Sequence, residues 1–337
     1  MRAVVYTRTG DSDVLGLVER AVPEPGPDEV RVRVRVSGVN PTDWQARRGG
    51  GSGQPTAFPE MVPGEDGAGT VDAVGPGVPA ERVGQRVWLW EAAWQRAGGT
   101  AQEFVVLPQR QAVPLPDGAS FDLGASLGIP ALTAHRCLTV AVGGPQRLAP
   151  GALAGRTVLV AGGAGAVGNA AIQLARWAGA TVVATVSGPE KAALARAAGA
   201  ATVVNYREGD PVAAVRAGAP DGVDIVVEVA PAANAALDAA VAAVGGTVAA
   251  YEGEDLTIPL WPLMRKNIGY QFVLVYTVPA AVKRYAVEDV SAAVSAGALR
   301  VGAGAGLPLH RYPLAHAARA HDAVEGGAVG KVLIDID

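Results

Sequence analysis

The sequence predicts an α/β fold in which an irregular β-rich part is joined to a doubly wound parallel sheet. Short valine-rich runs broken by Gly and Pro fill roughly the first 120 residues, as is typical of short strands linked by turns. From about residue 122, helical patterns alternate with near-continuous apolar runs. Such runs are typical of strands that are buried on both faces of a parallel sheet.

The β-rich part contains five expected strands, each rich in valine and bounded by turn residues. They span 3–6, 30–39, 69–74, 86–90 and 103–107. In the second of them, Arg31, Arg33 and Arg35 alternate with valines, which places the three guanidinium groups on one face. No aromatic residues are interleaved, so a solvated strand face is favoured over a stripe that binds nucleic acid.

The remaining elements alternate in type along the chain. We expect strands at 157–163, 180–186, 201–206, 224–230, 246–251, 270–276 and 331–336. We expect helices at 168–178, 189–198, 282–297 and 313–325. Because helical segments separate the earlier of these strands, the strands between 157 and 276 are expected to form one parallel sheet, and the strand at 331–336 closes the chain.

Composition narrows the class of protein. The chain has 337 residues, 50% of them hydrophobic, and a mean hydropathy of +0.23, so we expect two domains. No run of about 18 apolar residues would span a membrane, and the N-terminus lacks the pattern of a secretory signal. The single cysteine, Cys137, fits a cytoplasmic protein without disulfides. A net charge of −4 and a pI of 5.7 argue against nucleic-acid binding.

The run "AGGAGAVG" at 161–168 matches G-x-G-x-x-G, although about one accidental match is expected in so glycine-rich a chain. An expected strand leads into it and an amphipathic helix follows, as in dinucleotide-binding folds. Gly163 is predicted to make the tight turn, Gly165 to admit a pyrophosphate, and Gly168 to let the helix and strand pack closely. N–H groups of the helix start, at Ala166 and Val167, face the phosphates. A glycine-rich turn that binds nothing is the alternative.

The end of the strand at 180–186 predicts which dinucleotide binds. A carboxylate there would accept the ribose 2′-OH of NAD, but this strand is followed by Ser187 and, one helical turn later, Lys191. These side chains can bind a 2′-phosphate, so NADPH is favoured. An alternative role for Ser187 is a capping box with Glu190, and both roles can hold together.

The chain resembles the zinc-independent quinone oxidoreductases of the medium-chain dehydrogenase/reductase superfamily, the group that includes zeta-crystallin. The matching motifs cover nearly the whole chain: "SGVNPTDWQARRG" (37–49), "VPGEDGAGTVDAVGPGV" (62–78), "GIPALTAHRCL" (128–138), "VLVAGGAGAVGNAAIQLARWAGA" (158–180), "VVNYREGD" (203–210) and "RYPLAHAARAHDAVEGGAVGKVLI" (311–334). The resemblance implies a GroES-like catalytic domain at 1–121 and 279–337 and a Rossmann NADPH-binding domain at 122–278.

The resemblance also implies cofactor contacts. Residues matching the family's 2′-phosphate contacts are Ser187, Lys191 and Tyr206. Thr133 matches a threonine near the nicotinamide, and Gly330 and Lys331 match the family's "GK" near the end of the chain. Tyr206 as a packing residue and Lys331 as a surface lysine are the ordinary alternatives.

The residues around Asn40 predict a reaction without a metal. Zinc relatives hold their metal with Cys, His or Glu, whereas this chain reads "GVNPTDW" and "GED" at the corresponding positions and has one cysteine. Without a Lewis acid, the acceptor must already be electrophilic, such as a quinone or a conjugated enone. Asn40 matches the family's active-site Asn. Members of that family often have a tyrosine shortly after this Asn, where this chain has Trp44 and Gln45. The two alternative roles for Trp44 are stacking on a flat substrate ring and packing in the core.

Other readings remain open from sequence. An enoyl-thioester reductase or a polyketide-tailoring enoyl reductase would share this fold and cofactor, and Arg47 and Arg48 offer the obvious basic pair for a CoA phosphate. A structural or regulatory protein that binds NADPH without turnover is a different class. The resemblance suggests a homodimer paired through the strand near 270–276, whose apolar edge would otherwise be exposed.

Overall fold

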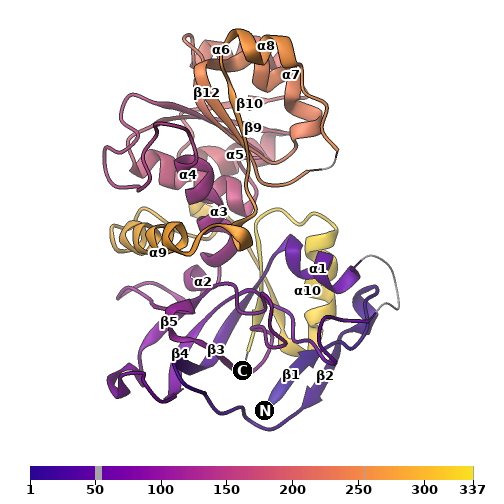
Figure 1. Cartoon of the computed structure of the whole chain (residues 1–337). Coiled ribbons are helices and arrows are strands. Elements are labelled where there is room, and N and C mark those ends of the chain that lie inside the picture. Colours follow the sequence, from indigo (N-terminus) through magenta and orange to yellow (C-terminus); the bar gives the residue numbers. More distant parts are fainter. Residues whose placement is uncertain (50–54, 254, 337) are drawn as a thin grey trace. The chain divides into compact units, whose positions relative to one another are not determined.

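The computed structural model describes residues 1–49, 55–253 and 255–336. The chain forms two compact units, one made of Met1–Ile129 with Leu309–Asp337 and the other of Pro130–Pro308 (Figure 1). This division differs from the predicted boundaries, since 279–308 lies in the second unit. Its helix α9 (Ala280–Ser295) is held there by Asp289, which accepts hydrogen bonds from the Leu148 N–H at 2.7 Å and pairs with His135 at 2.8 Å.

The first unit is built on a seven-stranded sheet. Its strands follow the order β14-β15-β3-β4-β5-β7, with β6 paired to β3, and β1 and β2 form a separate hairpin-like pair. The strands are β1 (Arg2–Val5), β2 (Gly16–Glu19), β3 (Glu29–Val39), β4 (Asp66–Val74), β5 (Arg86–Leu89), β6 (Phe104–Pro108), β7 (Ala112–Pro114), β14 (Leu309–Pro313) and β15 (Lys331–Asp335). The final strand β15 pairs with β3, so a segment from the C-terminal end of the chain joins the sheet of the N-terminal part.

Alternation along β3 sets its two faces. Val32 and Val34 are buried in the core, whereas Arg33 and Arg35 are exposed, as the sequence predicts. Arg31 bonds Asp72 across the strand pair and lies over the Phe104 ring. Arg31 is thus paired locally while Arg33 and Arg35 face solvent, which agrees with the solvated-face interpretation.

Three helices accompany this sheet. They are α1 (Pro41–Arg48), α2 (Phe121–Gly124) and α10 (Ala317–Glu325). Helix α10 is shorter than the predicted 313–325, because Leu309–Pro313 pairs with β15 as β14 before the helix begins. Helices α1 and α10 pack together, and the buried Arg47 binds Glu325 at 2.7 Å between them.

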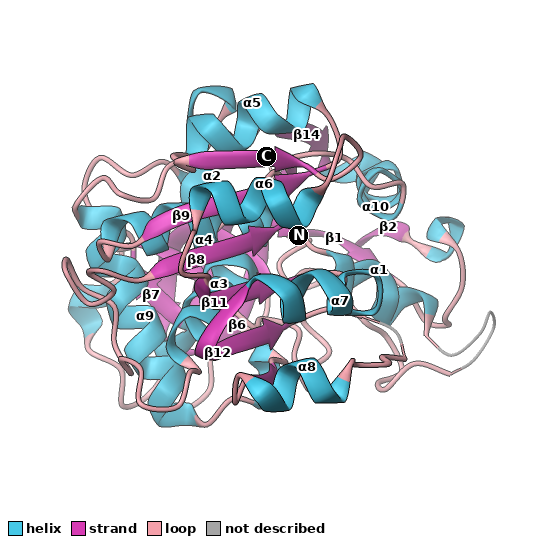
Figure 2. Ribbon diagram, turned by 90° about the horizontal axis from the view of Figure 1, so that it is seen from above, coloured by secondary structure: helices cyan, strands magenta, loops and turns pink. Residues whose placement is uncertain are grey.

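The second unit contains the predicted parallel sheet. Its six strands follow the order β10-β9-β8-β11-β12-β13 and pair in parallel throughout, and β8, β9, β11 and β12 lie side by side in Figure 2. They are β8 (Thr157–Ala161), β9 (Thr181–Val186), β10 (Thr202–Asn205), β11 (Val223–Glu228), β12 (Ala242–Ala250) and β13 (Gly269–Phe272). The strand order reverses between β8 and β11, which is where doubly wound folds bind ligands, at the carboxyl ends of the strands.

The helices of this unit follow its strands. They are α3 (Gly128–Thr139), which begins just before the unit's first residue, α4 (Ala166–Trp177), α5 (Pro189–Ala198), α6 (Pro211–Gly218), α7 (Pro231–Val241), α8 (Leu260–Arg265) and α9. The predicted strand at 270–276 is too long, because β13 ends at Phe272 and Val275–Thr277 forms a short 3-10 turn. In the described part of the chain, no helix is both long and apolar enough to cross a membrane.

Candidate active site

The glycine-rich loop lies at the carboxyl end of β8. Gly162 has a φ of +68° and makes the tight turn, and its N–H and that of Gly163 donate to the Thr185 carbonyl at 3.1 and 3.2 Å. The structure therefore corrects the assignment of the turn to Gly163. A Cβ on Gly163 would lie 2.9 Å from the Ala184 Cβ, so this glycine allows close packing against β9 instead.

Gly168 and Gly165 face very different surroundings. A Cβ on Gly168 would lie 2.3 Å from the Gly162 carbonyl oxygen, so the start of α4 packs directly on the loop backbone. A Cβ on Gly165 would meet only that same oxygen, at an ordinary 3.5 Å. The backbone at Gly165 thus borders space that a ligand can fill, whereas the backbone at Gly168 does not.

The first turn of α4 offers hydrogen-bond donors to that space. Gly165 is the N-cap and has no side chain to cap the helix, so the N–H groups at Ala166 and Val167 have no partner within the helix. These N–H groups and the helix dipole favour an anion. The loop and the helix start together fit the pyrophosphate of a dinucleotide.

Residues after β9 and β10 lie at one edge of the sheet. The Tyr206 N–H donates to the Val186 carbonyl at 3.0 Å, so Tyr206 is beside the end of β9, and its side chain is 47% exposed. Ser187 lies in the connection after β9 and Lys191 in the first turn of α5, and both are half-buried. The N-cap of α5 is Gly188 and no side chain caps it, so the capping box of Ser187 and Glu190 is wrong. Thr133 lies on α3 and is buried.

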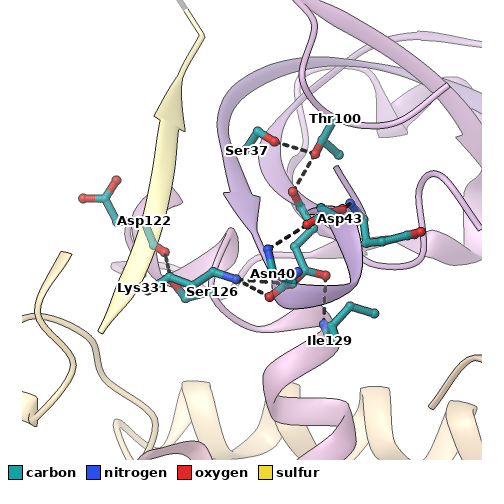
Figure 3. A network of polar contacts seen from close by, with 10 residues as sticks. Ser37, Asn40, Asp43, Thr100, Asp122, Ser126, Ile129 and Lys331 are labelled. Atoms are coloured by element: carbon teal, nitrogen blue, oxygen red, sulfur yellow. Dashed lines mark hydrogen bonds and ion pairs between the residues drawn. The ribbon is translucent and has the colours of Figure 1, made fainter. Parts of the chain in front are cut away.

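The first unit contains a buried polar network around Asn40. The Lys331 ammonium donates to Asn40 Oδ1 at 2.6 Å, and Asn40 Nδ2 donates to Asp66 Oδ2 at 2.8 Å (Figure 3). Lys331 and Asp66 also form an ion pair at 3.6 Å, and all three residues are at most 2% exposed. Two predicted residues that are 291 positions apart are therefore joined, and the surface-lysine alternative for Lys331 is wrong.

The chemistry of the partners fixes the orientation of the Asn40 amide. Its oxygen faces an ammonium and its nitrogen faces a carboxylate, whereas a flipped amide would place like groups together. The amide nitrogen carries a second N–H beside the one that bonds Asp66. Gly330, with a φ of +116°, makes the turn that leads Lys331 into the network.

Asp66 is the residue whose role the sequence left unassigned. Its Oδ1 accepts the Ile129 N–H at 2.8 Å, and its backbone carbonyl accepts the Thr100 hydroxyl at 2.7 Å. A Cβ on Gly128 would lie 2.0 Å from Asp66 Oδ1, so only glycine fits beside this carboxylate. The run "GED" was its signal in the sequence.

Burial opposes the charges of this network. Burial lowers the pKa of the Lys331 ammonium, and the carboxylates of Asp66 and Asp43 oppose that change. Burial raises the pKa of Asp66, which Lys331, the Asn40 amide and the Ile129 N–H oppose. Because each charge has its counter-charge and hydrogen bonds in place, we assign the ionic pair, and the pair places a fixed cation next to Asn40.

Helix α1 presents the other predicted residues. Asp43 Oδ2 accepts the Asn40 N–H at 2.7 Å at the helix start. Trp44 is half-buried and Gln45 is exposed. The helix residues that line the neighbouring cavity are Asp43 and Ala46.

Among the described residues, no group of three or more His, Cys, Asp or Glu side chains has a geometry that could hold a metal ion. Cys137 is buried, and burial raises the pKa of its thiol. It is therefore a small core residue of α3 rather than a ligand or a nucleophile.

Comparison with known proteins agrees with both units. The family model described as alcohol dehydrogenase GroES-like domain matches residues 26–117, and the one described as zinc-binding dehydrogenase matches 166–292. Human quinone oxidoreductase is 30% identical over 99% of this chain and 97% of its own length. The chain belongs to the quinone oxidoreductase group of the medium-chain dehydrogenase/reductase superfamily.

Two solved structures extend the comparison over the whole chain. A mycobacterial protein complexed with NADPH is 30% identical over 99% of each chain, with a TM-score of 0.79. An NAD-dependent alcohol dehydrogenase is 29% identical over 100% of each chain, with a TM-score of 0.86. The GroES-like and Rossmann architecture of the family is thus the architecture of this chain.

Proposed function

We propose that the protein is an NADPH-dependent oxidoreductase that transfers hydride to a quinone or another conjugated enone without a metal. The observation that carries the proposal is the loop after β8, whose backbone at Gly165 borders open space below the free N–H groups of α4. That arrangement suits a dinucleotide pyrophosphate. The mycobacterial relative complexed with NADPH supports the same cofactor here.

The residues that would hold the cofactor follow from their positions. Gly163 and Gly168 keep the loop tight, while Gly165, Ala166 and Val167 would bind the pyrophosphate. Ser187, Lys191 and Tyr206 would bind the 2′-phosphate at the edge of the sheet, and the residue directly after β9 is Ser187 rather than a carboxylate that would bind a free 2′-OH. Thr133, Gly330 and Lys331 complete the proposed contacts.

Bound NADPH would supply a hydride, and the chain's own groups would stabilise the negative charge that forms on the acceptor oxygen. The second N–H of Asn40 is a donor for that oxygen, and the neighbouring Lys331 ammonium strengthens it electrostatically. This fixed cation and amide take the place of a Lewis acid, which favours acceptors that are already conjugated. A half-buried Trp44 and the exposed Gln45 on α1 are further candidates for contacts with a planar acceptor.

The enoyl-thioester alternative loses its supporting residues. The Arg47 side chain is fully buried and donates to the Gly10 carbonyl and to Glu325. Arg48 pairs with Asp11 and Glu325. Both guanidinium groups are therefore already engaged within the unit, and neither offers a free phosphate site.

We also propose a cytoplasmic homodimer that is paired through β13. This strand is the edge of the parallel sheet, and Phe272 and Leu274 beside it are 74% and 52% exposed. An exposed edge with apolar side chains is a liability that a second copy would cover. Sedimentation of the protein and of a Phe272→Lys variant tests this, and an unchanged monomer mass in both contradicts it.

The function is tested by following NADPH and NADH absorbance in chelator with a quinone, an enone and an enoyl-CoA in parallel. We expect oxidation with the quinone or enone, a preference for NADPH, and no loss of activity after dialysis against chelator. Oxidation with the thioester alone would replace the proposal by the enoyl-reductase function. Tight NADPH binding without turnover by any acceptor would leave a non-catalytic binding protein.

A further inference from the structure

A small cavity in the first unit lies beside the start of α1. Its volume is about 160 Å³, and its lining residues include Tyr6, Asp43, Glu65, Ala93 and Trp94. We call it the acidic cavity, because two of its lining residues are carboxylic acids. A cavity of about 150 Å³ is large enough for a benzene ring, so the acidic cavity can hold one six-membered ring.

Glu65 is held rigidly in the wall of this cavity. Its Oε2 accepts the N–H groups of Ala93 and Trp94 at 3.1 and 3.0 Å, and its own backbone N–H donates to Asp43 Oδ1 at 3.2 Å. Glu65 is 8% exposed. Since Oε2 receives two donors, a proton on this carboxyl belongs on Oε1.

Asp43 and Glu65, the two carboxyls of the cavity wall, differ in whether they have an oxygen left to bond a ligand. Both oxygens of Asp43 accept backbone N–H groups, from Asn40 at 2.7 Å and from Glu65 at 3.2 Å. Asp43 therefore serves to anchor α1 to the start of β4. Glu65 has one oxygen anchored, which leaves the other for a ligand.

Neighbouring positions in the chain give Glu65 and Asp66 opposite environments. Asp66 faces the Lys331 ammonium at 3.6 Å, whereas Glu65 faces the acidic cavity. Burial raises the pKa of Glu65 well above its usual value, and Asp43, Asp66 and Glu91 raise it further, while the Ala93 N–H opposes them. The other ionisable groups around the cavity are Tyr6, whose pKa burial raises to about 12, Arg47, and Arg96, whose pKa burial lowers.

We propose that Glu65 is the general acid of the reaction and donates its Oε1 proton to the oxygen of a single-ring quinone or enone bound in the acidic cavity. This inference rests on the proposed function. Bound NADPH would supply the hydride that forms the new bond to the acceptor and would be oxidised, and the acceptor oxygen would gain the electron pair. The Glu65 O–H bond breaks, that oxygen takes the proton, and the Glu65 carboxylate is reprotonated from water.

The direct test is the Glu65→Gln variant, with Glu91→Gln as its matched control. Glutamine keeps an acceptor for the Ala93 and Trp94 N–H groups but cannot donate an acid proton. Glu91 is a buried glutamate in the loop that carries Ala93 and Trp94. Its replacement by glutamine is the same chemical change. With 1,4-benzoquinone, we expect Glu65→Gln to lower kcat by about 10²- to 10⁴-fold with little change in NADPH affinity, and Glu91→Gln to retain most of kcat.

The pH profile separates acid catalysis from a structural role. A general acid works while it is protonated, so the wild-type kcat should fall as pH rises through the raised pKa of Glu65. That alkaline limb should persist in Glu91→Gln, moved to lower pH because Glu91 raises the pKa of Glu65, and be absent from the residual activity of Glu65→Gln. A wild-type rate and an unchanged alkaline limb in Glu65→Gln would overturn the inference.

A second readout does not depend on turnover. The infrared difference spectrum of wild type minus Glu65→Gln at neutral pH should contain the carbonyl band of a protonated carboxylic acid, and only carboxylate bands would overturn the inference. If wild type fails to oxidise NADPH with every quinone and enone tested, the proposed function itself fails. If wild type turns over and Glu65→Gln equals it, only the role of Glu65 fails.

Discussion

The two units build their candidate sites in opposite ways. In the Rossmann unit, the cofactor loop is a continuous stretch of backbone from Gly162 to Gly168, and its shape depends on missing side chains. In the GroES-like unit, the network joins Asn40, Asp66 and Lys331, which are separated by up to 291 positions, and depends on side-chain charge. A site made of adjacent backbone is therefore sensitive to added volume, whereas a site made of distant side chains is sensitive to a lost partner.

The largest expected effect concerns volume in the loop. Gly165→Val should weaken NADPH binding by at least about 100-fold, near 3 kcal/mol, because the side chain would fill pyrophosphate space. Its melting temperature should stay close to that of wild type. Titration calorimetry and thermal unfolding measure the two quantities.

Gly168→Ala is the matched control for that variant. Its Cβ would lie 2.3 Å from the Gly162 carbonyl oxygen, so it should destabilise the fold itself by a few kcal/mol. Unaltered NADPH affinity in Gly165→Val would mean that the loop does not hold the cofactor.

The side-chain network should respond to loss of charge. Asp66→Ala leaves the Lys331 ammonium buried without its carboxylate, which should cost about 3–5 kcal/mol of unfolding free energy. Adding Lys331→Met to Asp66→Ala should recover part of that loss. Asp72→Ala, which breaks the Arg31 pair on the strand surface, should cost about 1 kcal/mol or less in the same denaturant titration. Equal costs for both aspartates would show that the network is not a buried ion pair.

A smaller effect is expected at the 2′-phosphate. Lys191→Ala should raise the KM for NADPH by about 10- to 100-fold, because one hydrogen bond between charged groups is lost. The KM for NADH should change little. Arg196→Ala, near the other end of α5, should change neither value. Equal changes for the two cofactors would remove Lys191 from the phosphate site.

The smallest effect is the change in unfolding free energy per pH unit that is due to a buried pair of acids in the Rossmann unit, Glu228 and Asp238. Burial and the neighbouring Glu228 raise the pKa of Asp238 to about 9. An unfolded Asp loses its proton near 3.8, so between these values the folded state binds one more proton, and raising the pH lowers the unfolding free energy. The slope should approach about 1.4 kcal/mol per pH unit and be reduced in Asp238→Asn but not in Asp221→Asn, an exposed aspartate. If the unfolding free energy of Asp238→Asn fell with pH as steeply as that of wild type, the raised pKa of Asp238 would be contradicted.

The sequence predicted best what is local. Strand β9 (Thr181–Val186) and helix α5 (Pro189–Ala198) lie close to the predicted ranges, because hydrophobic period and turn residues act over a few positions. The choice of Gly163 over Gly162 as the turn residue failed because both lack a Cβ. Only the backbone path, with a φ of +68° at Gly162, separates them.

Long-range contacts were less accessible to sequence reasoning. The resemblance pointed to Asn40 and Lys331 separately, but no local pattern connects either of them to Asp66. Likewise, Glu65 and Asp66 are adjacent and chemically alike in the sequence. Their different environments arise because Lys331 at the start of β15 pairs with Asp66, whereas N–H groups of the loop at 91–95 bond Glu65.

The most direct test of this account is a single-turnover measurement of NADPH absorbance with excess enzyme, chelator and 1,4-benzoquinone, for wild type and Gly165→Val. The account predicts acceptor-dependent oxidation of NADPH by wild type, slower oxidation of NADH, and no enzyme-dependent oxidation by Gly165→Val. Equal rates for wild type and Gly165→Val, or no oxidation by wild type, would contradict it.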